Sequence, residues 1–171
     1  DIIFFWVARM AFQAVHFTGK MPFKDCFIHG LVRDEFGRKM SKSLGNGIDP
    51  IDVVKEYGVD SLRYALATTV TPGLDMSFGM DKIRSASTFL NKIWNASRYI
   101  LINLGDDFEP VEDVSKLKLS AADQYLYKNF NSTIEAVKKN MDKYELGQAS
   151  KYLYNFIYDI FCSNYIEFAK M

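Results

Sequence analysis

Apolar residues at helical spacing fill the second half of this 171-residue chain and limit the folds open to it. Side chains three and four positions apart lie on one face of an α-helix, and such helices pack as a bundle. We therefore expect a helical bundle, with the third helix deep inside it because its aromatic residues occupy more than one face. The positions that carry the pattern are, in the first helix, Ile83, Ala86, Leu90, Ile93, Trp94, Ser97 and Leu101; in the second, Ala122, Leu126, Phe130, Val137 and Met141; and in the third, Leu153, Phe156, Ile157, Ile160, Phe161 and Phe168.

The beginning of the chain has a different pattern. Residues 1–17 predict a helix with apolar side chains on most faces, which is typical of a buried helix. After a break at residues 18–22, the short apolar run Phe23–Val32 predicts a strand. A short apolar run of this kind after a buried helix indicates an interior strand of an α/β sheet, where both faces are covered.

A polar segment and two short helices are expected to join these parts. Residues 33–47 are polar, contain three glycines and predict a loop. Asp-Pro at residues 49–50 predicts a helix start, because Asp caps the first turn and Pro fits its first position. This helix should end near Gly58, and another should span residues 60–68 before the Thr-Pro-Gly break at 71–73.

Composition excludes several classes of protein. Apolar residues form 49% of the chain and charged residues 25%, which excludes a disordered chain. Lysine plus arginine equals aspartate plus glutamate at 21 each, so any nucleic-acid contact requires locally concentrated positive charge. Cys26 and Cys162 lack metal-ligand spacing, so we expect no metal site and a reduced, cytoplasmic protein. The apolar run Ile2–Met10 contains Arg9 and is shorter than the roughly 18 residues of a membrane span, so no membrane partner is expected.

The loop Gly37–Asn46, with sequence GRKMSKSLGN, is the most informative stretch. Lys39 and Lys42 stand three positions apart among serines, with glycines on both sides. Flexible glycines allow backbone amides and two ammonium groups to close over a compact anion, and phosphate is the obvious guest. A solvated surface turn is the ordinary interpretation of a bare Lys-x-x-Lys pair, so the prediction depends on the longer pattern.

Residues 39–43, KMSKS, resemble the signature of class I aminoacyl-tRNA synthetases without a substitution. The resemblance implies that an amino-acid carboxylate attacks the α-phosphate of ATP, and that the aminoacyl group then passes to tRNA. It implies that Lys39 and Lys42 are catalytic and stabilise the departing pyrophosphate. Met40, Ser41 and Ser43 would bind ATP with them. ATP would be a substrate that brings Mg²⁺, and the chain itself would hold no metal.

Three flanking motifs resemble the valine-specific branch of this family. They are DIIFFWVARM at 1–10, HGLVRD at 29–34 and NKIWNASR at 91–98. The branch implies L-valine and tRNA(Val) as substrates and a parent enzyme that is monomeric. The isoleucine branch shares the loop and is a close alternative, but Trp6 and the Arg-Met pair at 9–10 fit the valine pattern better.

The same resemblance assigns roles near the loop. Asp1 would bind the ribose hydroxyls of ATP, and His29 and Gly30 would lie beside its adenine. Ile2 and Trp6 are four positions apart on one helix face and would line the valine pocket. Simpler alternatives remain open, because Asp1 also suits a helix cap, Ile2 and Trp6 suit core packing, and a lone His is often structural.

The family implies a mostly α chain in three parts. Residues 1–48 would be the C-terminal part of a Rossmann-type α/β nucleotide-binding domain, and residues 49–80 a helical junction that contacts the tRNA stem. Residues 81–171 would be part of an α-helical anticodon-binding bundle. Local positive charge comes from Arg33, Arg38, Lys39 and Lys42. A polar stripe on the first long helix is the expected tRNA-binding face, with Arg84, Thr88, Asn91, Asn95 and Arg98.

Other expected parts of such an enzyme are missing from the sequence. The HIGH signature of the family has no match, since His16-Phe17-Thr18-Gly19 departs from it, and no editing domain is visible. Because the chain also begins at Asp1 within an apolar stretch, we expect an internal fragment that is inactive alone. A tRNA-binding module without chemistry is therefore an alternative function, and an unrelated helical protein is a remote one.

Overall fold

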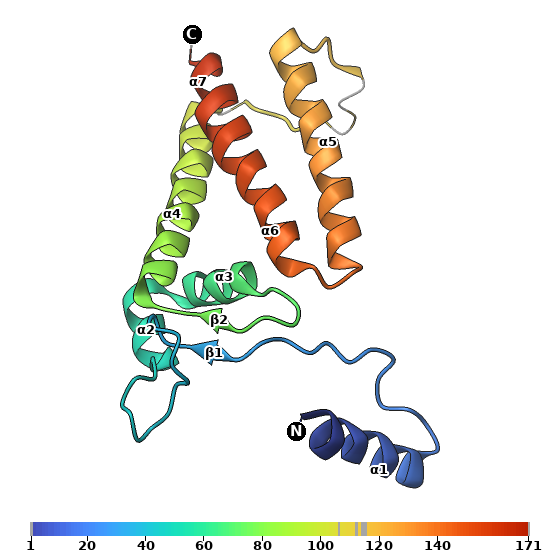
Figure 1. Cartoon of the computed structure of the whole chain (residues 1–171). Helices are drawn as coiled ribbons and strands as arrows, with labels where there is room; N and C mark the ends of the chain where they lie inside the picture. Colours follow the sequence, from blue (N-terminus) through green and yellow to red (C-terminus); the bar gives the residue numbers. More distant parts are fainter. Residues whose placement is uncertain (1, 106, 112, 114–115, 171) are drawn as a thin grey trace.

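Three long helices make up the second half of the molecule, as the sequence predicts (Figure 1). The computed structural model describes residues 2–105, 107–111, 113 and 116–170. The third helix is continuous, has wider π-type turns in its middle, and lies between the other two (Figure 1). The bounds are α4 (Met80–Asn103), α5 (Ala121–Met141) and, within the third helix, α6 (Leu146–Asn155), η3 (Phe156–Tyr165) and α7 (Ile166–Ala169).

The third helix extends beyond the apolar positions that predict it and is less enclosed than expected. It starts at Leu146, and Gly147 allows it to approach the preceding part of the chain, since a Cβ there would lie 2.9 Å from the Val70 carbonyl oxygen. Cys162 is buried, but Phe168 is 61% exposed. The expectation of a deeply buried helix is therefore wrong, because α3 (Val59–Thr69), α4 and α5 contact different stretches of this helix and leave part of its surface uncovered.

The apolar stripe of α4 is buried only along its first half. Ile83, Ala86 and Phe89 are buried, whereas Trp94 and Leu101 are 70% and 69% exposed. The first half packs against the short helices α2 (Pro50–Tyr57) and α3 (Val59–Thr69), while the second half meets η3. Helical spacing identified the helix correctly, but it does not say which apolar positions find a partner.

The hydrophobic core lies where α2, α3 and the start of α4 meet. Both short helices confirm the predicted positions, and the Asp49 carboxylate caps α2 by accepting a hydrogen bond from the Ile51 amide at 2.8 Å. Met40, within the loop Gly37–Asn46 (the lysine loop), and Ile48, two residues after it, pack against this core. The buried residues of the core are Val53, Ala65, Phe78, Ile83 and Ala86.

The predicted strand Phe23–Val32 is wrong for most of its length. Only β1 (Val32–Arg33) forms a ladder, and it pairs in parallel with β2 (Met76–Ser77), which the sequence did not reveal. The residues before β1 are irregular, and Ile28 and Leu31 are 41% and 55% exposed. A strand needs a neighbour for its backbone groups, and the described residues offer this segment only β2.

The first helix forms as predicted but is not buried. It consists of η1 (Ile2–Val7) and α1 (Ala8–Thr18), and it stands apart from the other helices at the end of an extended segment (Figure 1). Phe4 is 88% exposed and Phe17 is 79% exposed. Its apolar faces lack a covering layer among the described elements, so the expectation of burial is wrong in this structure. No helix in the described ranges has both the length and the apolar character needed to cross a membrane.

Candidate active site

The lysine loop leaves the end of β1 and returns to the start of α2 (Figure 1). A tight turn begins it, in which the Asp34 amide donates to the Arg38 carbonyl and the Gly37 amide donates to the Asp34 carbonyl, both at 2.9 Å. Gly37 adopts a positive φ of 77°, which glycine tolerates without strain. Arg33 and Lys39 form an antiparallel bridge across this turn, and this bridge fixes the backbone position of Lys39.

Asp34 is the buried charged residue at the base of this loop, with 5% of its surface exposed. One carboxylate oxygen accepts hydrogen bonds from the Phe36 and Arg38 amides at 3.1 and 2.7 Å. The other accepts from Arg38 Nε at 2.8 Å and from Asn46 Nδ2 at 3.0 Å. Burial alone would raise the pKa of this carboxyl, but the hydrogen bonds and the Arg38 charge outweigh burial and lower the pKa from 3.8 to about 2.

Asn46 connects the hydrogen bonds of Asp34 to the backbone of the loop. Its Oδ1 accepts a hydrogen bond from the Ser41 amide at 2.9 Å, and its Nδ2 donates to the Lys39 carbonyl at 3.2 Å. The amide of Asn46 therefore holds the backbone on both sides of Met40. Because the same Nδ2 also donates to Asp34, the buried carboxylate and the loop are parts of one hydrogen-bonded unit.

The second half of the loop is a turn closed by hydroxyl and backbone groups. Ser41 Oγ accepts a hydrogen bond from the Leu44 amide at 3.2 Å and lies 3.2 Å from Ser43 Oγ. The Gly45 amide donates to the Lys42 carbonyl at 3.3 Å, and Gly45 has a positive φ of 59°. The backbone around Lys42 is thereby folded back on itself, and its side chain is free to project from the turn.

The expected cluster of four positive charges is reduced to two. Arg33 Nε pairs with the Asp75 carboxylate, and Arg38 Nε pairs with Asp34. Lys39 and Lys42 are exposed, and neither forms an ion pair with any residue that the structure describes. The two residues of this group without an ion pair are therefore the two lysines of the KMSKS sequence.

His29 and Gly30 lie ahead of β1. His29 is exposed, and its Nδ1 lies 2.8 Å from the Gly30 carbonyl oxygen. A Cβ at Gly30 would lie 1.8 Å from the Leu74 carbonyl oxygen, so glycine is required by the backbone that crosses it. The Asp75 carboxylate fixes the same crossing by accepting from the Leu31 amide at 2.9 Å. That bond and the Arg33 hydrogen bond hold the pKa of Asp75 below its usual range.

The predicted valine-pocket residues are not close to the loop. Ile2 and Trp6 lie on η1 and are 56% and 51% exposed, and this helix is separated from the lysine loop by the extended segment (Figure 1). Asp1, the predicted ribose ligand, lies outside the described residues. The structure thus brings together the phosphate-binding candidates and leaves the amino-acid pocket candidates apart from them.

The predicted tRNA-binding stripe is one exposed face of α4. Part of its polar capacity is used internally, because Arg84 Nε donates to the Tyr57 hydroxyl at 3.2 Å and Asn95 donates to the Asn91 carbonyl at 2.9 Å. Thr88 likewise donates to the Arg84 carbonyl at 3.0 Å. The exposed members of this face are Arg84, Thr88, Asn91, Asn95 and Arg98.

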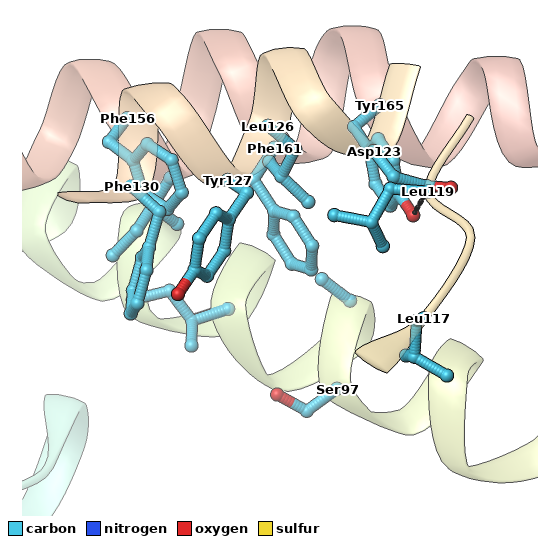
Figure 2. Close-up of a pocket in the computed structure, with 13 residues that line it drawn as sticks. Ser97, Leu117, Leu119, Asp123, Leu126, Tyr127, Phe130, Phe156, Phe161 and Tyr165 are labelled. Carbon is cyan, nitrogen blue, oxygen red and sulfur yellow. Dashed lines mark hydrogen bonds between the residues drawn. The ribbon is translucent and has the colours of Figure 1, made fainter. Parts of the chain in front are cut away.

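A separate cavity of about 630 Å³ lies between α4, α5 and η3 (Figure 2). Aromatic rings such as those of Phe130, Phe156 and Phe161 line it, and no lysine or arginine of the described ranges does. At one end the Tyr165 hydroxyl donates to Asp123 at 2.7 Å, a hydrogen bond drawn in Figure 2. Among the described residues, the one charged group that lines this apolar cavity is a carboxylate, so the cavity is poorly suited to phosphate.

Sequence reasoning missed the residues that shape the loop. Asp34 and Asn46 lie inside the HGLVRD and GRKMSKSLGN motifs, which by themselves assign neither residue a role, and no local pattern points to Asp75. Opposite charges four positions apart at Asp34 and Arg38 were the available signal. The partnership of Asp75 with Arg33 spans 42 positions and depends on β1–β2 pairing, which no local pattern predicted.

Comparison with known proteins identifies both halves of the chain. Residues 1–79 match the family of class I tRNA synthetases for I, L, M and V, and residues 123–171 match the anticodon-binding domain of tRNA ligase. The whole chain is 58% identical to a valine–tRNA ligase of Bacillus thuringiensis subsp. konkukian, covering 19% of that protein. It is 56% identical to the valine–tRNA ligases of Staphylococcus epidermidis and Bacillus subtilis, covering 20% and 19% of them.

A solved structure shares the fold. The LeuRS–tRNA–LeuAMS ternary complex from Agrobacterium radiobacter K84 superimposes with a TM-score of 0.69 over 86% of this chain and 20% of that chain, at 23% identity. The chain spans about a fifth of the length of the curated relatives it matches. With an intact KMSKS loop, two matching family domains and extensive identity to valine–tRNA ligases, the chain belongs to the class I aminoacyl-tRNA synthetases.

Proposed function

We propose that this chain is a segment of a cytoplasmic, monomeric valine–tRNA ligase that activates L-valine with ATP and transfers it to tRNA(Val). The observation that carries the proposal concerns Lys39 and Lys42. Neither lysine forms an ion pair with a described residue, and both lie on a loop whose backbone is held by hydrogen bonds at both ends. The printed names of the relatives support valine as the amino acid and do not favour the isoleucine alternative.

The reaction explains why two cations are needed. A carboxylate oxygen of valine attacks the α-phosphorus of ATP, the bond to the β-phosphate oxygen breaks, and pyrophosphate leaves with the electron pair. Lys39 and Lys42 would stabilise the negative charge that grows on this leaving group. Mg²⁺ would enter bound to ATP, as part of the substrate. The adenylate carbonyl is then attacked by a ribose hydroxyl of tRNA, and AMP departs.

Other residues would complete the ATP site. Met40 would anchor the loop by packing on the core, and Ser41 and Ser43 would offer their hydroxyl groups to phosphate oxygens. His29 and Gly30 would lie beside the adenine. Asp1 would bind the ribose, and Ile2 and Trp6 would line the valine pocket once their helix packs near the loop.

We divide the chain into three parts with different proposed roles, as the family resemblance implies. We assign residues 1–48 to the nucleotide-binding domain, 49–80 to a junction that contacts the tRNA stem, and 81–171 to the anticodon-binding bundle. The exposed face of α4, with Arg84, Asn91, Asn95 and Arg98, would face tRNA. Unstacked anticodon bases are commonly held by arginine and amide side chains of this kind.

The catalytic role of Lys42 can be tested in the full-length enzyme that contains this segment. Lys42→Ala should slow single-turnover valyl-adenylate formation by about 10²–10³-fold, because one electrostatic donor to the leaving group is lost. The dissociation constant for valine should hardly change. Lys139→Ala on α5 removes the same charge from another exposed site and serves as the control. A Lys42→Ala enzyme with an unchanged single-turnover rate would refute the assigned role.

A further inference from the structure

We propose that Asp34 and Asn46 are positioning residues that form a clasp around the KMSKS loop and hold its backbone in the geometry required for adenylate formation. The proposal rests on the proposed function for its kinetic consequence. Its structural content concerns hydrogen bonds that can be measured separately from activity.

The clasp joins the two ends of the loop through one buried carboxylate. Asp34 receives the backbone amide and Nε of Arg38, directly before Lys39, and Nδ2 of Asn46, three positions after Ser43. Each of its oxygens accepts two hydrogen bonds. An ionised carboxylate is a pure acceptor with room for four such bonds, which makes Asp the fitting residue at this junction.

Asn46 transmits this anchoring to the lysines. With its Nδ2 shared between Asp34 and the Lys39 carbonyl, and its Oδ1 on the Ser41 amide, the side chain has one orientation that satisfies every partner. Lys39 and the residue preceding Lys42 are therefore fixed by the same amide group. Side chains that fix the backbone next to catalytic groups preorganise those groups for the transition state.

The burial of Asp34 argues that the clasp is a built feature. Among the described residues, the buried polar and charged side chains are Asp34 and Ser61, and no buried side-chain nitrogen or oxygen lacks a partner. A buried carboxylate is tolerated only when its partners compensate for lost water. The compensating groups here come from the loop itself. If the loop opened at either end, the Asp34 carboxylate would lose hydrogen bonds or become exposed to water.

The isosteric substitution Asp34→Asn separates the clasp from general packing. The new amide keeps one acceptor oxygen, but its NH₂ group must face either Arg38 Nε and Asn46 Nδ2 or the two backbone amides. All four of those groups are donors, so two hydrogen bonds are lost in either orientation. Glu35→Gln changes the same charge at the adjacent, exposed position and is the matched control.

The test uses the full-length enzyme with Asp34→Asn, Asn46→Ala, their combination and Glu35→Gln. We expect each clasp variant to slow single-turnover adenylate formation by about tenfold to a hundredfold, the usual effect of displacing a catalytic group by about 1 Å. Valine affinity and the Glu35→Gln rate should stay at wild-type values. The double variant should be no slower than the slower single variant, because both substitutions break one unit.

Amide hydrogen exchange of the loop gives a readout that does not depend on catalysis. The Ser41 and Arg38 amides should lose protection in both Asp34→Asn and Asn46→Ala and keep it in Glu35→Gln. Unchanged exchange and unchanged adenylation in both clasp variants would overturn the proposal. If Asp34→Asn does not fold, the half-buried Asn46→Ala variant decides by the same two readouts. If the wild-type enzyme does not activate valine but the clasp variants still lose loop protection, the proposed function is refuted and the proposal of a clasp stands.

Discussion

At the scale of single residues, a buried carboxylate organises the loop that carries the two lysines without ion-pair partners among the described residues. Asp34 neutralises Arg38, and Asp75 neutralises Arg33, so two of the four nearby cations are structural. Lys39 and Lys42 are left without such partners among the described residues, which concentrates the available charge at the two positions that the family signature defines. The sequence pattern predicted a role for these lysines. Only the ion pairs of the structure show that, of the four nearby cations, the two arginines are paired and the two lysines are not.

The depressed pKa of Asp34 predicts a pH-dependent stability. Because folding lowers the pKa from 3.8 to about 2, the ionised carboxylate is favoured in the folded protein. Its contribution to the free energy of unfolding is fully present above pH 3.8 and is lost as the pH falls through about 2. Chemical unfolding followed across this range should show a steeper loss for the wild-type protein than for Asp34→Asn.

The comparison with Asp34→Asn is needed because other carboxylates act in the same direction. Hydrogen bonds from Tyr165 and Ser120 lower the pKa of Asp123, and Asp75 is also lowered. These groups titrate in both proteins, so the difference between the two curves isolates Asp34. Parallel curves for the two proteins would show that Asp34 is not stabilised in its ionised form.

At the scale of elements, each helix forms where its own residues direct it, and its burial depends on neighbours. Asp49 caps α2, and Ser120 and Asp123 form a reciprocal capping box at the start of α5, so these ends are fixed locally. The exposed Trp94 on α4 and the exposed Phe4 on η1 carry the same apolar signal as buried residues. Periodicity therefore predicts helices well and interior positions less well.

The polar face of α4 supports a prediction about tRNA. Arg98→Ala should weaken binding of tRNA(Val) to the full-length enzyme and should reduce the slope of log affinity against log salt by about one, as expected for a lost phosphate contact. Arg98 is the cleaner choice because Arg84 also bonds to Tyr57 and so contributes to packing. Binding should be measured at two salt concentrations with tRNA(Val) and tRNA(Ile).

The control for this prediction is Lys20→Ala, which removes one positive charge just after the end of α1, a helix that stands apart from α4 (Figure 1). That variant should bind both tRNAs as the wild-type enzyme does. If Arg98→Ala leaves both the affinity and the salt slope unchanged, the α4 face does not contact tRNA.

At the scale of the whole molecule, local chemistry was predictable and long-range pairing was not. The helices, the turn at residues 71–73 and the lysine loop follow from caps, spacing and glycines close together in the chain. Strand β2, the crossing of Gly30 over Leu74 and the Arg33–Asp75 pair join positions more than forty residues apart. The phosphate-binding candidates share one loop, while Ile2 and Trp6 lie on a helix that no described element covers.

If this chain provides the ATP-phosphate loop of a valine-activating enzyme, it should function in place of the same segment of a related ligase. The most direct test replaces the corresponding segment of the Bacillus subtilis valine–tRNA ligase, which is 56% identical, with this chain. The chimera should catalyse valine-dependent exchange of pyrophosphate into ATP, prefer valine to isoleucine, and lose about 10²–10³ of its rate on Lys42→Ala. A chimera that melts cooperatively but exchanges no pyrophosphate with valine, or prefers isoleucine, would contradict the claim.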